Sequence, residues 1–178
     1  MRGLCENGAR TYSVRSADLM KPTVYIETTV IGHLTTRLPA DAVVAGQMLA
    51  TRKWWVDARP HFDVFTSELV LAEASRGDPT ASAERLAALV DVPLLAIPDA
   101  SADLADALVA RGALPFKARV DAAHLAVAAT TGMEYLLTWN CRRLANATLR
   151  SRIEQACRER GFEPPIICTP LELTEVRP

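Results

Sequence analysis

The sequence has little of several features that would mark a specialised class of protein. Only four of its 178 residues are cysteines, and no two of them form a Cys-x-x-Cys pair, so neither a zinc finger nor a disulfide framework is expected. Aromatic residues make up 6%, which argues against a surface that stacks several bases in a row. No segment approaches the ~18 consecutive apolar residues of a membrane span.

Other absences concern catalytic motifs and targeting. No Gly-x-Gly-x-x-Gly or Walker-type loop is present, which disfavours a nucleotide-binding enzyme, and no Gly-x-Ser-x-Gly is present, which disfavours a serine hydrolase. Residues 1–20 are polar and contain no apolar run typical of a secretory signal. We therefore expect a cytoplasmic protein with reduced thiols and no membrane association.

The charge is nearly balanced overall but uneven along the chain. The formal net charge is −1, so bulk positive charge does not hold this protein on nucleic acid. Residues 139–162 nevertheless contain six arginines and two acids, whereas residues 63–109 contain nine acids and two arginines. This asymmetry permits a local basic face, although the counts alone favour two solvated helix faces.

Hydrophobic residues make up 49% of the chain, which is enough for one packed core at this length. We predict a polar, disordered N-terminal tail over residues 1–20 and a single domain over residues 21–175. Short apolar runs at 24–27, 62–66, 93–97, 135–139 and 165–169 are typical of strands, and helical patterns lie between them. The prediction is a three-layer α/β domain with a mostly parallel sheet of about five strands.

Polar residues that follow these strands are candidates for a site, because ligands bind at the carboxyl ends of strands in open α/β sheets. Glu27 follows the first predicted strand, Glu73 lies on the helix after the second, and Asn140 follows the fourth. Asp121 lies within an otherwise apolar helix, where a carboxylate needs a partner. An ion pair with Lys117 is the ordinary explanation for Asp121.

Together these four side chains predict more than each does alone. Carboxylates gathered at one sheet edge repel one another unless a cation neutralises them. Oxygen donors without His or Cys suit Mg²⁺ or Mn²⁺, and one or two such ions could activate water against a phosphodiester. Glu27, Glu73, Asp121 and Asn140 are therefore the predicted catalytic and metal-binding residues.

The segments that carry these residues resemble the motifs of PIN-domain ribonucleases, in particular the VapC-like toxins of bacterial toxin–antitoxin systems. The similar segments are Tyr-Ile-Glu-Thr-Thr-Val-Ile at 25–31, Ser-Glu-Leu-Val-Leu-Ala-Glu-Ala at 67–74, Val-Asp-Ala-Ala-His-Leu-Ala-Val-Ala at 120–128 and Leu-Leu-Thr-Trp-Asn at 136–140. The resemblance implies a PIN-like fold and a metal-dependent endoribonuclease acting on single-stranded RNA. It also implies a small antitoxin partner that blocks the site, often with a dimeric toxin.

The sequence departs from the pattern of that family at two positions. The first acid is usually Asp and here is Glu27, and the fourth is usually Asp and here is Asn140. These departures keep an alternative open, namely a weak or inactive PIN-fold module that binds RNA or a partner protein.

Further candidates surround the predicted acids. Thr28, Thr138, Arg142 and Arg143 are predicted substrate contacts, the arginines because cations are disfavoured at a helix start without an anionic ligand. Glu68 is a weaker candidate than Glu73, since an acid in the first turn of a helix complements the dipole. His124, one turn after Asp121, is predicted to be a hydrogen-bonded core residue rather than a substrate contact.

Overall fold

The computed structural model describes residues 21–174, so the predicted tail at 1–20 and residue 175 of the predicted domain lie outside the described part. The strands are β1 (Thr23–Ile26), β2 (Asp63–Ser67), β3 (Leu94–Leu95), β4 (Tyr135–Leu137) and β5 (Ile166–Cys168). They form one sheet in the order β3-β2-β1-β4-β5, and every neighbouring pair is parallel. The predicted α/β class with five short, parallel strands is confirmed.

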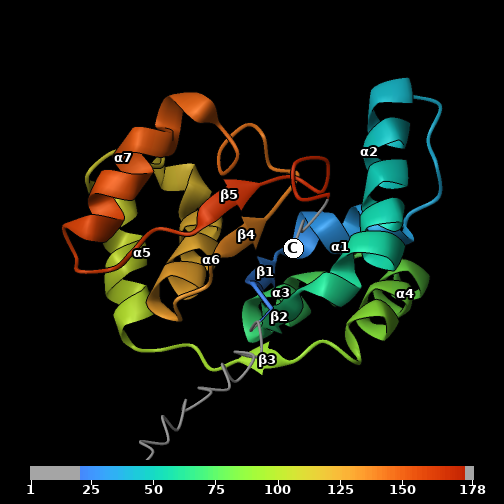
Figure 1. The fold of residues 1–178 in the computed structure, drawn as a ribbon, viewed down its shortest axis with the longest axis horizontal. Helices are drawn as coiled ribbons and strands as arrows, with labels where there is room; N and C mark the ends of the chain where they lie inside the picture. The colour runs from blue at the N-terminus through green and yellow to red at the C-terminus, as the bar shows by residue number, and fades with distance from the viewer. Residues whose placement is uncertain (1–20, 175–178) are drawn as a thin grey trace, which may run out of the picture.

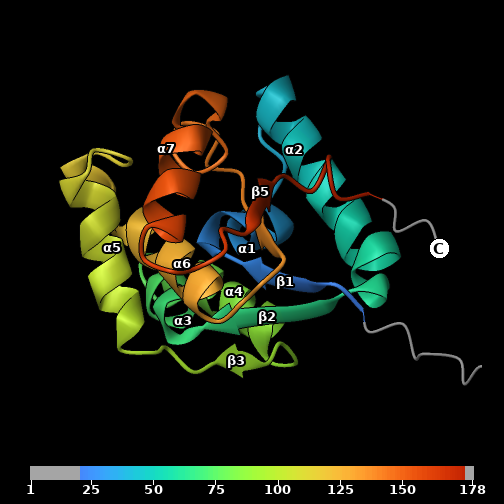
Figure 2. The same cartoon turned by 60° about the vertical axis from the view of Figure 1, so that its left-hand side comes forward.

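Helices cover both faces of this sheet (Figures 1 and 2). Helices α1 (Thr28–Thr35), α2 (Ala42–Lys53) and α4 (Pro79–Leu89) lie on one side. Helices α5 (Ala100–Ala110), α6 (Arg119–Thr130) and α7 (Ala147–Arg158) lie on the other, and α3 (Glu68–Ala74) follows β2 directly. Three short helical segments complete the described chain, namely η1 (Trp54–Ala58), η2 (Arg59–His61) and η3 (Phe116–Ala118).

The strand order has one reversal, and it determines where a site can form. From β1 the chain proceeds outward through β2 to β3, then crosses back to β4 on the opposite side of β1 and ends at β5. The carboxyl ends of β1 and β4 therefore flank the point where the connections diverge, which is where open parallel sheets bind ligands. Glu27 follows β1 and the Thr138–Asn140 segment follows β4, so both lie at this point.

The core explains why the central strands are short and apolar. Tyr25, Ile26, Leu136 and Leu137 are fully buried between the two helix layers. On α6 every residue from His124 to Ala129 is buried, which accounts for its alanine-rich sequence close against the sheet. Burial of this kind fixes the helix that carries Asp121 rigidly relative to β1 and β4.

Several predicted boundaries are longer than the observed elements. The strand predicted over 93–97 is only Leu94–Leu95, at the sheet edge beside β2. The 3₁₀ turn η3 directly precedes α6, and the helix between the last two strands begins only at Ala147. Asn146 caps α7 by accepting a hydrogen bond from the Thr148 amide at 3.0 Å, which sets that later start.

Candidate functional site

Glu27 lies at the junction between β1 and α1, where it caps the helix. Its side chain provides the cap by accepting the Thr29 backbone N–H at 3.0 Å. The Thr29 hydroxyl also donates to Glu27, and so does the Thr138 hydroxyl. Glu27 is only 4% exposed, and burial raises the pKa of its carboxyl above the ordinary value, against the opposing effect of these hydrogen bonds.

Glu73 lies on α3 and is held by two side chains from other elements. His124 Nε2 on α6 lies 2.8 Å from Glu73 Oε2, and the Thr28 hydroxyl at the start of α1 donates to the same oxygen. The hydrogen bond from His124 is the main cause that lowers the pKa of Glu73 below its ordinary value, although partial burial opposes it. Glu73 is thus ionised and oriented.

A buried chain of hydrogen bonds extends behind His124. Its Nδ1 lies 2.9 Å from the Tyr25 hydroxyl, which lies 2.7 Å from the Ser67 hydroxyl. If His124 is neutral and donates Nε2–H to Glu73, Nδ1 has only a lone pair left and must accept from Tyr25. Tyr25 then accepts from Ser67. Burial raises the pKa of Tyr25 well above its ordinary value, so this phenol keeps its proton.

Asp121, in the first turn of α6, is held by two side chains from the loop after β4. Asn140 Nδ2 donates to Asp121 Oδ1 at 2.8 Å, and Arg143 Nη1 lies 2.8 Å from Asp121 Oδ2. The ion pair that the sequence suggested with Lys117 is therefore wrong: the partner is Arg143, and Lys117 offers only its backbone carbonyl, 3.4 Å from the same guanidinium nitrogen. Side chains of Asp121 and Arg143 are 15% and 31% exposed, so the pair lies at the rim.

The loop after β4 connects these groups into one network. The Trp139 backbone N–H donates to the Thr29 hydroxyl at 2.8 Å, and the Asn140 N–H donates to the Thr138 hydroxyl at 2.8 Å. Thr29 and Thr138 both contact Glu27, and Asn140 contacts Asp121. Glu27, Asp121 and Asn140 therefore belong to a continuous set of contacts, and Glu73 joins through Thr28, the residue after Glu27.

The side chain of Trp139 fixes the position of this loop. Its Nε1 donates to the Thr51 hydroxyl of α2 at 2.7 Å, and its ring stacks on His33 of α1 with centroids 5.6 Å apart. The loop that carries Asn140 is thereby attached to the opposite helix layer. Such support keeps the polar groups in place without a bound ligand.

The donor set is made of oxygen atoms from carboxylates and an amide, which suits a hard divalent cation. Within residues 21–174, however, no group of three or more His, Cys, Asp and Glu side chains is gathered as a metal site. Protein groups hold the acids instead: Arg143 forms an ion pair with Asp121, and His124 forms a hydrogen bond with Glu73. The chemistry of the donors therefore fits Mg²⁺ or Mn²⁺, and binding would require Asp121 to exchange Arg143 for the ion.

The other predicted residues are distributed around this network. Thr28 and Thr138 were predicted to contact substrate, and in the structure their hydroxyls hold Glu73 and Glu27. Arg142 is exposed beside Arg143, whereas Glu68 is exposed in the first turn of α3 and contacts none of the network. The main element that sequence reasoning missed is the Tyr25–Ser67 extension behind His124. The available signal was a tyrosine and a serine placed where apolar strand residues are usual.

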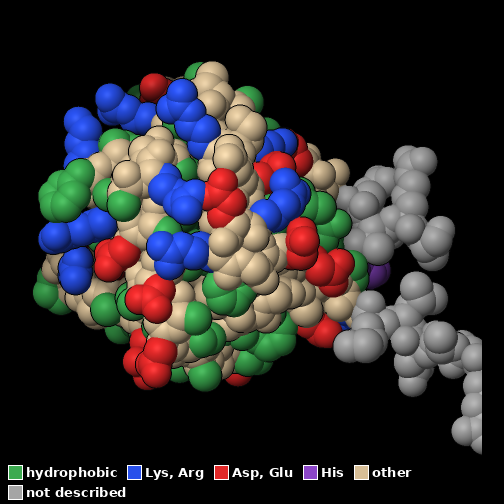
Figure 3. Space-filling view, turned by 90° about the vertical axis from the view of Figure 1, so that its left-hand side faces the viewer, with side chains coloured by type: hydrophobic (Ala, Val, Ile, Leu, Met, Phe, Trp, Pro, Cys, Tyr) green, Lys and Arg blue, Asp and Glu red, His purple; other side chains and the backbone are tan. Residues whose placement is uncertain are grey.

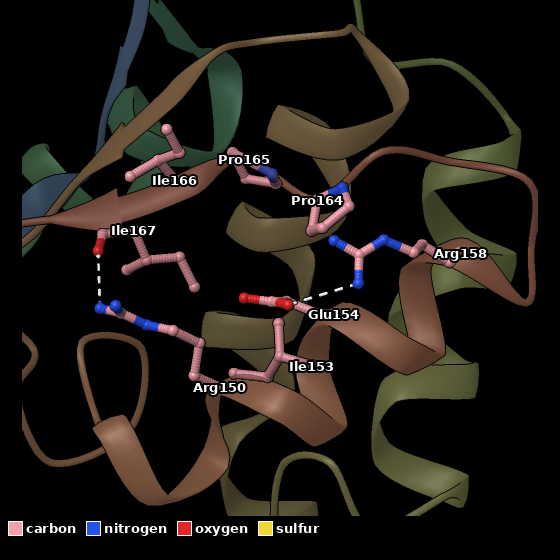
Figure 4. Close-up of a pocket in the computed structure, with 8 residues that line it drawn as sticks. All are labelled: Arg150, Ile153, Glu154, Arg158, Pro164, Pro165, Ile166 and Ile167. Atoms are coloured by element: carbon pink, nitrogen blue, oxygen red, sulfur yellow. Dashed lines mark hydrogen bonds and ion pairs between the residues drawn. The ribbon is translucent and has the colours of Figure 1, made fainter.

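A separate pocket lies between α7 and β5 (Figure 4). Arg150 closes one end by donating to the Ile167 carbonyl at 3.2 Å, and Glu154 pairs with Arg158 at the other. None of the predicted site residues lines this pocket. Arginines on this side of the molecule form the basic face seen in Figure 3, over α5 to α7, which corresponds to the basic segment in the sequence.

Comparisons with known proteins identify one structural neighbour among the chains that match. The sequence matches no protein-family profile and no curated protein. The structure is similar to a member of the VapBC family of toxin–antitoxin systems, VapBC-5, from Mycobacterium tuberculosis. The similarity has a TM-score of 0.44 at 20% identity and covers 70% of this chain and 92% of the neighbour.

In the described part of the chain, no helix combines the length and apolar character needed to cross a bilayer. Cys141 is exposed, whereas Cys157 and Cys168 are buried, and all three are free thiols. Burial raises the pKa of Cys157 to about 11 and that of Cys168 to about 12. Cys157 and Cys168 are packed in the core, and the backbone carbonyl of Cys168 accepts the Thr138 N–H at 2.9 Å.

Proposed function

We propose that this protein is a metal-dependent endoribonuclease that cleaves single-stranded RNA in the cytoplasm. The observation that carries the proposal is the set of hydrogen bonds that joins Glu27, Asp121 and Asn140 at the strand reversal of a parallel sheet, with Glu73 held beside them by Thr28, the residue after Glu27. These residues lie far apart in the sequence, and burying polar side chains costs more free energy than burying apolar ones. Their shared polar contacts therefore indicate a common role rather than a contribution to stability.

In this proposal, Glu27, Glu73, Asp121 and Asn140 hold one or two Mg²⁺ or Mn²⁺ ions. Bound there, such an ion supplies an activated water molecule and offsets negative charge on the phosphodiester. His124 and Thr28 keep the Glu73 carboxylate ionised and oriented toward the site. Thr29 and Thr138 orient the Glu27 carboxyl by donating hydrogen bonds to it.

Arg143 has two roles in this mechanism. Without RNA it neutralises Asp121, which prevents the repulsion that unpaired carboxylates would otherwise suffer. Released from Asp121, the guanidinium would contact a phosphate oxygen of the substrate beside Arg142, since guanidinium groups bind phosphate oxygens in a bidentate manner.

The same set of contacts also favours a second candidate, a PIN-fold module that binds RNA or a partner protein without turnover. Arg143 and His124 already satisfy two of the carboxylates, and Glu27 is nearly inaccessible to solvent. A module of this kind would bind RNA unchanged by any divalent ion and would not cleave it.

A cleavage assay separates the two candidates. A labelled single-stranded RNA is incubated with the wild-type protein, with and without Mn²⁺, and with Asp121→Asn. The matched control is Asp106→Asn, which removes an exposed carboxylate on α5 away from the network. We expect Mn²⁺-dependent cleavage by the wild type and by Asp106→Asn, and none by Asp121→Asn. Equal cleavage by both variants would contradict the nuclease proposal.

The resemblance to VapC-like proteins supports a further part of the proposal, that the protein is the toxin of a bacterial type II pair. A small antitoxin would then cover the site, and the toxin would form a homodimer. Expression in a bacterial host tests this directly. Growth should stop with the wild type and continue with Asp121→Asn, and growth unaffected by the wild type would contradict the toxin role.

A further inference from the structure

Phe116 is an aromatic side chain left in water. It is 74% exposed at the start of η3, and no other aromatic residue within residues 21–174 is exposed to this degree. Most of the others, such as Tyr25, Trp54 and Trp139, are packed in the core. A single exposed apolar side chain is ordinary on a protein surface, so this ring points to a ligand only through the groups around it.

Phe116 also lies beside the candidate site. It precedes Lys117, whose backbone carbonyl is 3.4 Å from Arg143 Nη1, and the same nitrogen lies 2.8 Å from Asp121 Oδ2. η3 continues without a break into α6, whose first turn carries Asp121. The backbone next to Phe116 therefore contacts the Asp121–Arg143 pair, and the buried Ala118 ties this backbone to the core.

The surroundings of the ring are basic. The Arg119 guanidinium lies 5.8 Å from the centroid of Phe116, a distance typical of a cation–π contact. Lys117, Arg119 and Arg142 are all exposed, and none of them makes an ion pair with an acid in the described part of the chain.

This combination separates two kinds of occupant. The core of a protein–protein interface is depleted of charged residues, and burying Lys117 there without an acidic partner would cost free energy. A nucleic-acid strand, in contrast, brings phosphates for the cations and the face of a base for the ring. Charge complementarity therefore favours a nucleic-acid strand, which carries both phosphates and bases, over a second protein.

We propose that Phe116 and Arg119 form a stacking site for one unpaired base of single-stranded RNA, and that Lys117 and Arg142 contact the flanking phosphates. The inference rests on the proposed ribonuclease function and adds to it the residue that positions the strand. One ring supports one stacked base, in agreement with the low aromatic content of the chain. Because the stack lies next to Asp121, it would fix which phosphodiester enters the acidic network.

Binding without cleavage tests this site separately from the chemistry. A fluorescent 12-nucleotide single-stranded RNA is titrated in EDTA at fixed salt, and its anisotropy is recorded for wild type, Phe116→Ala, Phe116→Leu and Phe116→Trp. Val90→Ala is the control, because Val90 is an equally exposed apolar residue on another part of the surface. Stacking of one base accounts for a change in affinity on the order of 5- to 150-fold.

We expect Phe116→Ala and Phe116→Leu to weaken binding by such a factor, and Phe116→Trp and Val90→Ala to bind like the wild type. An RNA with abasic nucleotides should bind wild type and Phe116→Ala equally. Wild-type affinity in Phe116→Ala, or in Phe116→Leu, would overturn the proposal. So would a dimer in sedimentation that Phe116→Ala converts to a monomer with RNA affinity unchanged, since Phe116 would then be a subunit contact. Stacking confirmed in EDTA without cleavage in Mn²⁺ would refute the nuclease and leave this site standing.

Discussion

Replacing Arg143 with alanine is expected to tighten the binding of Mn²⁺ in the absence of RNA. In the structure the Arg143 guanidinium occupies Asp121 Oδ2 at 2.8 Å, while Asn140 occupies the other carboxylate oxygen. An ion that uses Asp121 must first displace Arg143. Alanine at this position removes the competitor and leaves an extra negative charge for the cation to neutralise.

The size of the effect follows from the exposure of the pair. Fully exposed ion pairs contribute about 0–1 kcal/mol, and hydrogen bonds to charged groups contribute about 1.5–3 kcal/mol. Asp121 is largely buried and Arg143 is about a third exposed, so an intermediate value of about 1–2 kcal/mol is appropriate. Since about 1.4 kcal/mol corresponds to a tenfold change, the dissociation constant for Mn²⁺ should fall by about 5- to 30-fold.

Isothermal titration calorimetry with Mn²⁺ measures this change. Arg160→Ala is the matched control, because it removes an exposed positive charge beyond the end of α7 without touching Asp121. Without metal, Arg143→Ala should also unfold at a lower temperature than the wild type, and Mn²⁺ should raise its melting temperature by a larger amount. Weaker Mn²⁺ binding in Arg143→Ala would refute the idea that the guanidinium and the ion compete for one carboxylate.

Three further predictions follow from the described contacts. His124→Ala should lower the free energy of unfolding at pH 7 by about 1–3 kcal/mol, because the hydrogen bond to an ionised carboxylate is lost. His124→Gln keeps a donor and should lose less. Chemical denaturation measures both losses, and equal losses would contradict this role. The raised pKa of Glu27 means that its native state retains a proton that the unfolded state has lost. Without metal, the stability of the wild type relative to Glu27→Gln should therefore fall as the pH rises above the ordinary glutamate pKa, and a constant difference would show that Glu27 titrates normally. Peptide mapping after alkylation at pH 8 should find Cys141 modified before Cys157 and Cys168, and faster modification of either buried thiol would contradict their raised pKa values of about 11 and about 12.

Much of the fold could be predicted because local signals and tertiary structure agree. The apolar runs around Tyr25 and Leu136 are buried on both faces, and such runs are typical of parallel strands. The strand at the edge of the sheet was harder to predict. The strand predicted at 93–97 contains apolar residues throughout, yet only Leu94 and Leu95 pair with β2. A strand at a sheet edge has a single neighbour, so the residues that pair with this neighbour determine how long the strand is. Pairing of that kind is a tertiary property, which local sequence does not encode.

In the candidate site, too, local sequence indicates some residues, whereas only the tertiary structure determines their partners. Glu27 and Asn140 could be selected from the sequence because they follow predicted strands, and Asp121 because it is a carboxylate in an otherwise apolar helix. Their partners could not be, since Arg143 and Lys117 are both cations within reach of Asp121 and only the path of the loop after β4 decides between them. For His124, the sequence predicted a buried, hydrogen-bonded ring, which the structure confirms, but it could not identify Glu73 and Tyr25 as its two partners.

Anomalous scattering from a crystal soaked in Mn²⁺ tests the central claim most directly, because it locates the ion relative to the side chains without relying on activity. The account predicts a peak at bonding distance from Asp121, within reach of Glu73 and Asn140, with Arg143 displaced from the carboxylate. A soaked crystal in which Arg143 still holds Asp121 and the manganese binds elsewhere on the chain, or not at all, would contradict it.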